Sequence, residues 1–261
     1  MTTPSGKGFE KLGNRVLRND RDAMTESVST IDWYERSYKS AGIHGQRRYP
    51  NEELIRFLAR NFSALTRRER SRISILDAGC GSCSNLWAIA REGFDAHGVD
   101  ISPEAIRLGR QILAEWGVEA ELKVGDFLRL PYDDRSFDVV VDIFSSFVLT
   151  FTQWKDYLKE VTRVLKVNGR FFLFTPSAES DAFKKPAPST RIDDFTLNGI
   201  HREDSPYYGN FYPFRFTEVG SLPALVRELG METESLELTS RTYNHTSENF
   251  QFISLESRRT F

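Results

Sequence analysis

The sequence predicts an α/β fold with a doubly wound, mostly parallel sheet, and three observations support this class. Apolar runs alternate with amphipathic segments between residues 72 and 175, a pattern typical of parallel strands covered by helices on both faces. The first of these runs ends in an acid and a Gly-x-Gly turn at residues 77–81, which indicates a strand leading into a ligand-binding loop. With 261 residues, the chain is long enough for one α/β domain with additions.

The spacing of apolar residues predicts the order of strands and helices in this core. Short apolar runs predict strands, and segments with an apolar residue at every third or fourth position predict helices. The clearest boundary is Ser102-Pro103-Glu104, where a capping hydroxyl, a proline and an acid predict a helix start. In chain order, we expect a strand at 72–77, a helix at 84–92, a strand at 95–100, a helix at 103–116, strands at 119–124 and 137–142, a helix at 153–166 and a strand at 169–175.

The regions on either side of these elements differ in character. Residues 1–28 are polar with little periodic apolarity, which predicts a flexible tail. An aromatic segment at 31–38 and an amphipathic helix that begins at Pro50 predict an N-terminal helical cap over residues 29–70. The core then occupies residues 71–261. We expect it to close with a helix at 218–229 and strands at 232–238 and 249–256.

A long irregular segment, residues 177–216, interrupts the core after the fifth strand. Prolines break any helical period in it, and a segment of this length is usually either a functional lid or a disordered excursion. Its aromatic content favours an ordered lid, because disordered segments are poor in aromatic residues. Since open α/β sheets bind ligands at the carboxyl ends of their strands, we expect a mobile lid with Gly199 and Gly209 as flexible points.

Two ligand classes use a glycine loop after the first strand, and the neighbouring residues separate them. The dinucleotide fingerprint has a third glycine, for which this chain has Ser84. Asp77 stands two residues before Gly79, where a carboxylate repels a phosphate but suits an ammonium or sulfonium group. Asp100 ends the next apolar run, from which a carboxylate can accept the hydroxyls of a ribose. The pattern therefore favours a positively charged ligand over a dinucleotide.

At these motifs the chain resembles the class I S-adenosylmethionine-dependent methyltransferases. The resemblance starts with the acid-x-Gly-x-Gly motif and spans about residues 72 to 176 at the expected spacings. It continues through Asp100, Gly125-Asp126-Phe127 with Leu130-Pro131-Tyr132, Phe137 to Asp142, and Val164 to Arg170. It implies a seven-stranded Rossmann-like sheet whose last two strands form a hairpin with an antiparallel edge strand. It also implies a methyltransferase with S-adenosyl-L-methionine as cofactor and S-adenosyl-L-homocysteine as product.

The resemblance also implies the cofactor-binding residues. They are Asp77, Gly79, Gly81, Asp100, Ile101, Asp126, Phe127 and Asp142. Asp77 orients the glycine loop around the methionine portion, and Asp100 binds the ribose, with Ile101 against the adenine face. Asp126 receives the adenine amino group beside the Phe127 backbone. Each acid alone also fits a helix cap or a turn, but their joint placement at successive strand ends favours the cofactor.

The segment after the fourth strand narrows the class of methyl acceptor. It reads Asp142-Ile143-Phe144-Ser145, without the Asp/Asn-Pro-Pro-aromatic motif by which the amino-methylating nucleic-acid enzymes of the resembled family hold a planar amine. It contains no Pro-Cys pair, which excludes the cytosine C5 class, and the net charge of −2 argues against a nucleic-acid partner. We expect O- or N-methylation of a small molecule, such as a sugar or a biosynthetic intermediate. The alternatives are a protein-modifying methyltransferase and a non-catalytic cofactor-binding protein.

Few side chains are candidates to accept a proton from the methyl acceptor, because the chain has only four histidines. His44 lies in the predicted cap and His201 in the predicted lid, where an acceptor is expected. In the closed lid, we expect His201 and the Tyr207–Tyr208 pair to face the methyl group. The alternative is that these residues only form loops and pack, in which case positioning alone supplies the catalysis.

The only two cysteines, Cys80 and Cys83, form a C-x-x-C pair in the glycine loop. A structural zinc site needs four ligands, and the sequence has no second cysteine pair and no suitably spaced histidines to complete one. We therefore expect two small packing residues and no metal.

Nothing in the sequence indicates a membrane or an export signal. The polar start lacks the apolar centre of a signal peptide. No apolar run approaches the about 20 residues needed to span a bilayer. We expect a cytoplasmic protein without a membrane partner.

Overall fold

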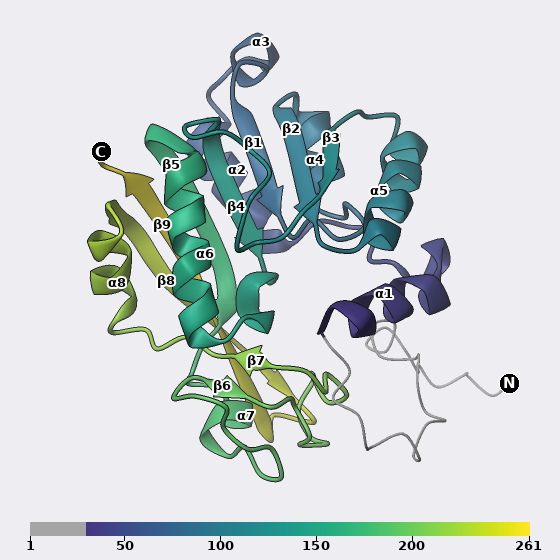
Figure 1. Cartoon of the computed structure of the whole chain (residues 1–261), viewed down its shortest axis with the longest axis vertical. Helices are drawn as coiled ribbons and strands as arrows, with labels where there is room; N and C mark the ends of the chain where they lie inside the picture. The colour runs from purple at the N-terminus through teal and green to yellow at the C-terminus, as the bar shows by residue number, and fades with distance from the viewer. Residues whose placement is uncertain (1–29) are drawn as a thin grey trace, which may run out of the picture.

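The computed structural model describes residues 30–261 and shows a central twisted sheet (Figure 1). The predicted tail at residues 1–28 lies outside the described residues. Seven strands form the sheet in the order β3-β2-β1-β4-β5-β9-β8. Their bounds are β1 Ser74–Ala78, β2 Asp95–Asp100, β3 Glu121–Val124, β4 Phe137–Ile143, β5 Leu165–Pro176, β8 Met231–Tyr243 and β9 Glu248–Arg259.

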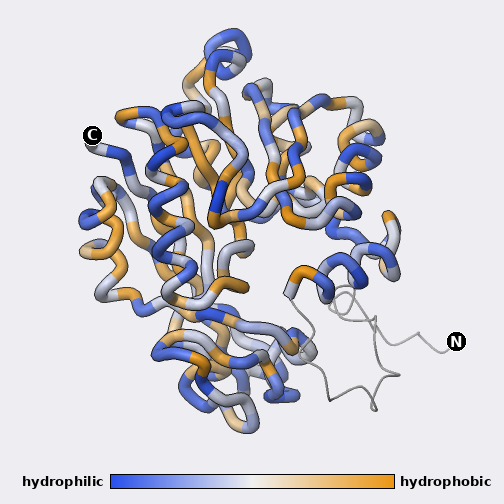
Figure 2. The backbone as a smooth tube through the Cα atoms, in the orientation of Figure 1, coloured by the Kyte–Doolittle hydropathy of each residue, from blue (hydrophilic) through white to orange (hydrophobic). Residues whose placement is uncertain are grey.

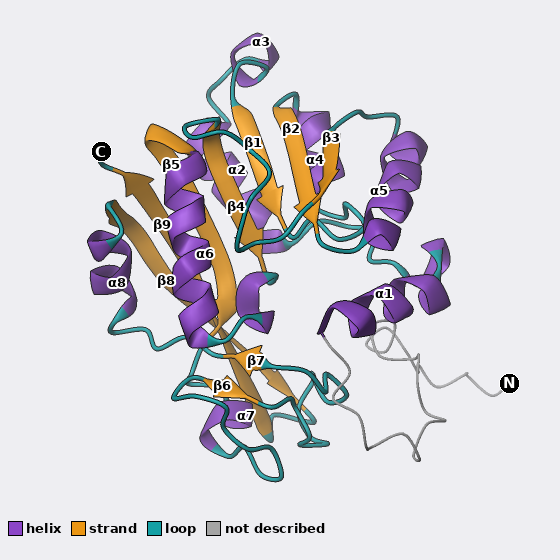
Figure 3. Cartoon of the chain, viewed as in Figure 1, coloured by secondary structure: helices purple, strands orange, loops and turns teal. Residues whose placement is uncertain are grey.

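Helices cover both faces of this sheet (Figure 3). One core cluster joins α2 (Glu52–Phe62), α4 (Leu86–Glu92) and α5 (Pro103–Trp116), and the other joins α6 (Phe151–Val164) and α8 (Leu222–Glu228). In β1, Ile75 belongs to the first cluster and Leu76 to the second, because successive strand residues point to opposite faces. Hydrophobic residues accordingly concentrate in the strands (Figure 2). None of the helices within residues 30–261 combines the length and the hydropathy needed to cross a membrane.

The strand pairing confirms the predicted fold class. β1 pairs in parallel with β2 and β4, and β4 pairs in parallel with β5. β9 is antiparallel to both β5 and β8, so the reversed strand lies one place in from the edge. The order brings the carboxyl ends of three strands together, with Asp77 opposite Gly98 of β2 and Val141 of β4. These strand ends form the edge at which open α/β sheets bind ligands.

The core elements lie close to their predicted positions. β2 and α5 have the predicted bounds, and Ser102 caps α5 through its side chain. β5 begins at Leu165, earlier than predicted, because the chain passes from α6 directly into extended backbone. α8 begins later than predicted because the Glu218 carboxylate accepts the N–H groups of Gly220 and Ser221 in a turn that precedes the helix.

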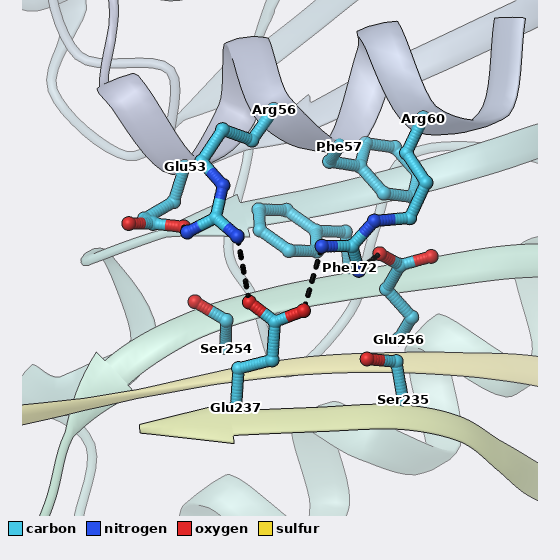
Figure 4. A pocket seen from close by; sticks show the side chains of 9 residues that line it. All are labelled: Glu53, Arg56, Phe57, Arg60, Phe172, Ser235, Glu237, Ser254 and Glu256. Atoms are coloured by element: carbon cyan, nitrogen blue, oxygen red, sulfur yellow. Dashed lines mark hydrogen bonds and ion pairs between the residues drawn. The ribbon is translucent and has the colours of Figure 1, made fainter. Parts of the chain in front are cut away.

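The predicted N-terminal cap divides into two parts with different positions. α1 (Thr30–Ala41) lies toward the carboxyl ends of the strands (Figure 1), whereas α2 packs on the sheet. The Phe57 ring of α2 stacks on Phe172 of β5 at 4.6 Å. Arg60 of α2 pairs with Glu237 of β8 at 2.6 Å and with Glu256 of β9 at 2.8 Å (Figure 4). Short helices η1 (Ile43–Gly45) and α3 (Arg67–Arg70) complete this region.

The segment at 177–216 is folded and joined to the core. It contains α7 (Asp181–Lys184) and a small antiparallel sheet of β6 (Thr196–Leu197) and β7 (Phe214–Arg215). Leu197 and Phe214 are fully buried in the same cluster as α2. Tyr208 and Phe211, between these two strands, are 42% and 51% exposed. The base of this insert is therefore part of the core, and any lid motion belongs to its tip.

Candidate functional site

The loop between β1 and α4 is tightly enclosed around its two glycines. Gly79 and Gly81 have φ angles of 77° and 51°, in the region that residues with a Cβ rarely adopt. A Cβ at Gly79 would lie 2.8 Å from the Phe127 ring, and one at Gly81 would lie 2.8 Å from the Tyr38 hydroxyl. The backbone N–H groups of Gly79 and Cys80 both donate to the Val99 oxygen of β2, which holds the loop against the neighbouring strand. Both glycines thus form the tight turn that the sequence indicates, and the predicted approach of a ligand to this loop stays a prediction.

Asp77 is an unpaired carboxylate at the base of this loop. The residue is fully buried, and neither carboxylate oxygen has a hydrogen-bond partner among the described residues. Burial and the nearby carboxylates of Asp142 and Asp100 raise the pKa of Asp77 to about 8. A buried carboxylate without a donor is unfavourable by itself. It fits a ligand that brings a positive, hydrogen-donating group to the loop.

Asp100 connects the end of β2 to the glycine loop. Its Oδ2 accepts the Gly81 N–H at 2.9 Å, and its Oδ1 accepts the Ser102 N–H at 2.9 Å. Burial raises the pKa of Asp100, while these two hydrogen bonds lower it. Ile101 follows at the strand end and is partly buried. The carboxylate is thus fixed in direction, and its remaining lone pairs are available to hydroxyl donors.

Helix α1 covers this loop, through contacts that the sequence analysis did not predict. Besides the approach of Tyr38 to Gly81, the Glu35 carboxylate accepts a hydrogen bond from the Ser102 hydroxyl at the start of α5. The Tyr34 hydroxyl lies 2.9 Å from the Tyr212 hydroxyl of the insert. None of its residues is fully buried, but the partly buried Trp33 and Tyr34 pack against the core, so apolar and polar contacts together hold the helix in place. The only advance signal was the aromatic spacing at positions 34 and 38, four residues apart on one helical face.

The segment after β3 contributes a ring and a turn. The Phe127 ring packs against Gly79 and lies 5.0 Å from the Tyr157 ring of α6. Asp126 is exposed, and its Oδ1 accepts the Leu128 N–H at 2.9 Å. The turn interpretation of Asp126 therefore describes its present contact, and its predicted contact with adenine stays a prediction.

The segment after β4 is held by Asp142, which is fully buried. Its Oδ1 accepts the N–H groups of Ser145 at 3.1 Å and Ser146 at 3.2 Å. The Ser145 hydroxyl in turn donates to the Gly79 oxygen at 3.0 Å. Burial raises the pKa of Asp142. Asp142 thus shapes the segment beside the glycine loop, and its predicted role in cofactor binding stays a prediction.

Comparison with known proteins agrees with this geometry. The methyltransferase-domain family matches residues 75–169, from β1 to the start of β5, which include the glycine loop and the ends of β2, β3 and β4. Over this region the chain is similar to methyltransferase domains. The resemblance seen in the sequence is therefore confirmed.

Relatives in this methyltransferase family differ in what they act on. EEF1A lysine methyltransferase 2 of Homo sapiens is 38% identical over 110 residues, which are 39% of this chain and 46% of that protein. Sterol 4-C-methyltransferase strm-1 of Caenorhabditis elegans is 31% identical over 104 residues, which are 39% of this chain and 30% of that protein. The chain thus spans less than half the length of these two curated relatives.

A solved structure shares the fold over nearly the whole length. It is the 1,6-didemethyltoxoflavin-N1-methyltransferase of Burkholderia thailandensis, determined with 1,6-didemethyltoxoflavin and S-adenosylhomocysteine bound. The identity is 14%, the TM-score is 0.58, and the match covers 91% of this chain and 93% of that chain. At this identity the likeness shows the fold alone.

The three catalytic candidates of the sequence analysis occupy different places. Tyr207 of the insert stacks on Phe144, at the end of β4, at 5.1 Å, and burial raises its pKa. His201 stacks on Phe211 at 4.7 Å. Within residues 30–261, neither His201 nor His44 has a hydrogen bond or ring contact with the glycine loop. Of the three, Tyr207 contacts the segment beside the glycine loop, and the catalytic roles stay predictions.

Cys80 and Cys83 are free, buried packing residues. The Cys80 sulfur would lie 2.8 Å from a Cβ at Gly98 of β2, and the Cys83 sulfur 2.5 Å from one at Gly109 of α5. Their small thiols fill the space between the loop, the strand and the helix. Both therefore act in the close packing of the glycine loop.

Proposed function

We propose that this protein transfers a methyl group from S-adenosyl-L-methionine to a small-molecule acceptor. The observation that supports it most is Asp77, a buried carboxylate with no donor in the described part of the chain. The ammonium group of the methionine portion is the kind of partner that such a carboxylate requires. Asp100, on the neighbouring strand end, suits ribose hydroxyls. A pyrophosphate brings no positive, hydrogen-donating group to these two acids, so NAD is the less suitable ligand.

In this proposal, different residues bind different parts of S-adenosylmethionine. They are Asp77, Gly79 and Gly81 for the methionine portion, Asp100 for the ribose, and Ile101, Asp126 and Phe127 for the adenine. When bound, S-adenosylmethionine supplies a methyl group already activated by its sulfonium. The chain's own task is to hold the acceptor in line and to exclude water. Tyr38 over the loop and the Tyr34–Tyr212 contact are suited to that exclusion.

The acceptor side is lined with aromatic rings and hydroxyls. Phe144, Tyr207 and Phe147 lie in one connected group of rings, which reaches Tyr212 and, through it, Tyr34. Small-ligand sites commonly combine apolar walls with a few polar groups. Tyr207, His201 and His44 are the candidates to take the acceptor's proton. The sterol and toxoflavin enzymes among the similar proteins, judged by their names, also favour a small acceptor.

A protein acceptor is the second candidate, because EEF1A lysine methyltransferase 2 is among the relatives. A protein side chain needs an open approach to the methyl group. The contact between α1 and the insert, made by the Tyr34 and Tyr212 hydroxyls, closes one side of that approach. This contact favours the small molecule.

Two experiments test the proposal. We expect calorimetry to detect binding of S-adenosylmethionine and S-adenosylhomocysteine and none of NAD; tight NAD binding without heat from either sulfur nucleoside would overturn the assignment. The acceptor is found by incubating the protein with methyl-labelled S-adenosylmethionine and either a metabolite extract or a protein extract. Label that appears only in proteins would replace the small-molecule proposal with the second candidate.

Asp100→Ala is expected to weaken S-adenosylhomocysteine binding by about 1.5–3 kcal/mol, the scale for losing hydrogen bonds to a charged group. Asp126→Ala should cost less, since one contact to an amino group is lost in place of two hydroxyls. Calorimetry measures both, with Asp156→Ala as the control, because that exposed side chain pairs with Lys159 on the surface of α6. Unchanged affinity in a folded Asp100→Ala protein would contradict the ribose assignment.

S-adenosylhomocysteine is expected to slow amide hydrogen exchange in α1 and in the insert tip at 199–212. The reason is that the Tyr34–Tyr212 contact joins these two segments over the site. Exchange in β6 and β7 should stay slow in both states, because Leu197 and Phe214 are already fully buried. Mass spectrometry of exchange with and without the ligand measures this. Equal protection of the tip in both states would make the insert a static wall.

A further inference from the structure

Arg215, at the end of β7, is a fully buried arginine for which the proposed reaction gives no role. Its guanidinium lies 3.9 Å from the centre of the Trp154 ring of α6. Nη1 donates to the Thr217 hydroxyl at 2.6 Å, and Nη2 donates to the backbone oxygen of Ser146 at 3.4 Å. Burying a guanidinium is costly unless it is paired and hydrogen-bonded. Its Nε has no hydrogen-bond partner among the described residues, so the structural contacts do not fully offset the cost of burying this guanidinium.

Asp142 and Arg215 hold the same short peptide segment from two sides. Asp142 accepts the N–H groups of Ser145 and Ser146, and Arg215 donates to the Ser146 carbonyl. Both side chains are fully buried, and each fixes this segment through hydrogen bonds to its backbone. Removing the guanidinium would take one of two donors from the Ser146 oxygen, which also accepts the Leu149 N–H.

The held segment touches the cofactor loop directly. The Ser145 hydroxyl donates to the Gly79 oxygen at 3.0 Å, and the Ser145 Cβ occupies the space where a Gly79 side chain would start. The preceding residue, Phe144, has a φ of 58°, which a residue with a bulky side chain rarely adopts unless its surroundings impose it. The position of Ser145 against Gly79 thus depends on the restraints placed on its segment.

We propose that Arg215 is a positioning residue that links the insert to the cofactor loop, by fixing the Ser145–Ser146 segment against Gly79. The proposal rests on the proposed function in one respect, that the glycine loop holds S-adenosylmethionine. Arg215 itself contacts Trp154, Thr217 and Ser146 and does not touch the glycine loop. It therefore acts on the cofactor only through the intervening segment, and its loss should weaken binding at a distance.

The test is the affinity for S-adenosylhomocysteine, measured by calorimetry at a temperature at which every variant is folded. Arg215→Met keeps the length and apolar packing on Trp154 but removes the charge and the donors, and we expect about tenfold weaker binding. Arg215→Lys keeps the charge but not the planar fork, and should lie in between. Arg259→Met is the control, because Arg259 also donates to backbone oxygens, of Thr162 and Leu165, at the opposite end of β5. It should lower the unfolding temperature and leave the affinity unchanged.

A double-mutant cycle with Ser145→Ala tests the route of the coupling. If Arg215 acts through Ser145, each single variant weakens binding by about tenfold. The double variant then weakens it by much less than the product of the two single fold-losses. If Arg215→Met does not fold, Arg215→Lys takes its place in the cycle. Unchanged affinity in the Arg215 variants, an equal loss in Arg259→Met, or purely multiplicative losses would each overturn the inference. Failure of the wild-type protein to bind would overturn the proposed function instead.

Discussion

Gly79→Ala is expected to reduce the affinity for S-adenosylhomocysteine by at least about 100-fold and to lower the free energy of unfolding by about 2–4 kcal/mol. Two physical effects combine at this position. The φ of 77° lies in the left-handed region, which costs a residue with a Cβ about 1–2 kcal/mol. The added Cβ would also lie 2.8 Å from the Phe127 ring and against Ser145, so the loop or both neighbours must shift. Either shift moves the backbone that the cofactor is proposed to contact.

Gly117→Ala is the matched control for this experiment. Gly117 ends α5 with a φ of 63°, and a Cβ there would meet no atom within 4 Å. Gly117→Ala should therefore lower the free energy of unfolding by about 1 kcal/mol, the cost of the left-handed conformation alone, and keep the wild-type affinity for S-adenosylhomocysteine. Chemical denaturation gives the free energies and calorimetry the affinities. If both variants lose the same stability and neither loses affinity, the close contact at Gly79 does not shape the cofactor loop.

The parts of the fold that were predicted from sequence are those fixed by local pattern. The α5 start was evident because a hydroxyl, a proline and an acid at Ser102-Pro103-Glu104 act within one helical turn. The carboxyl ends of β1 and β2 were equally evident, because each apolar run stops at an acid. The position of α2 was not predicted. Its amphipathic face indicates that the helix packs on another element, but not on which one. Its packing on the sheet depends on Phe172 and Glu256, which lie far along the chain.

In the site, too, local pattern was predicted from sequence and contacts between distant residues were not. Asp77, Gly79 and Asp100 could be identified because they sit at strand ends whose order the fold class determines. The contacts of Tyr38 with Gly81 and of Arg215 with Ser146 join positions that no sequence period relates. A buried arginine cannot be recognised among 35 basic residues without its surroundings. Long-range docking therefore decides how the loop is covered and supported.

Asp77 illustrates how a binding group destabilises the protein that carries it. Its carboxyl has a pKa of about 8 in the folded chain and an ordinary value of 3.8. Between these two pH values the folded protein binds a proton that the unfolded chain has released. The free energy of unfolding therefore falls as the pH rises from about 4 to about 8 and is lowest above that range. An ammonium ligand reverses this loss, because it favours the charged carboxylate.

Asp77→Asn should separate the effect of this carboxyl on stability from its effect on ligand binding. The amide has nearly the same shape without the charge, so the unliganded variant is expected to be about 1–3 kcal/mol more stable than the wild type at pH 8 and to show little gain at pH 4. Its affinity for S-adenosylhomocysteine should fall by about 100-fold or more, since a buried ionic partner of the ammonium is lost.

The pH dependence of binding tells whether the charge of Asp77 is responsible for both changes. In the wild type, the ligand must displace a proton below pH 8, so affinity should rise by up to about tenfold per pH unit from pH 5.5 to 7.5. Asp77→Asn has no proton to displace there and should give a nearly flat profile. Calorimetry across this range measures both slopes, with Asp156→Asn as a control that keeps the wild-type profile, because Asp156 is exposed on α6. Parallel slopes for the wild type and Asp77→Asn would show that the ammonium does not bind at Asp77.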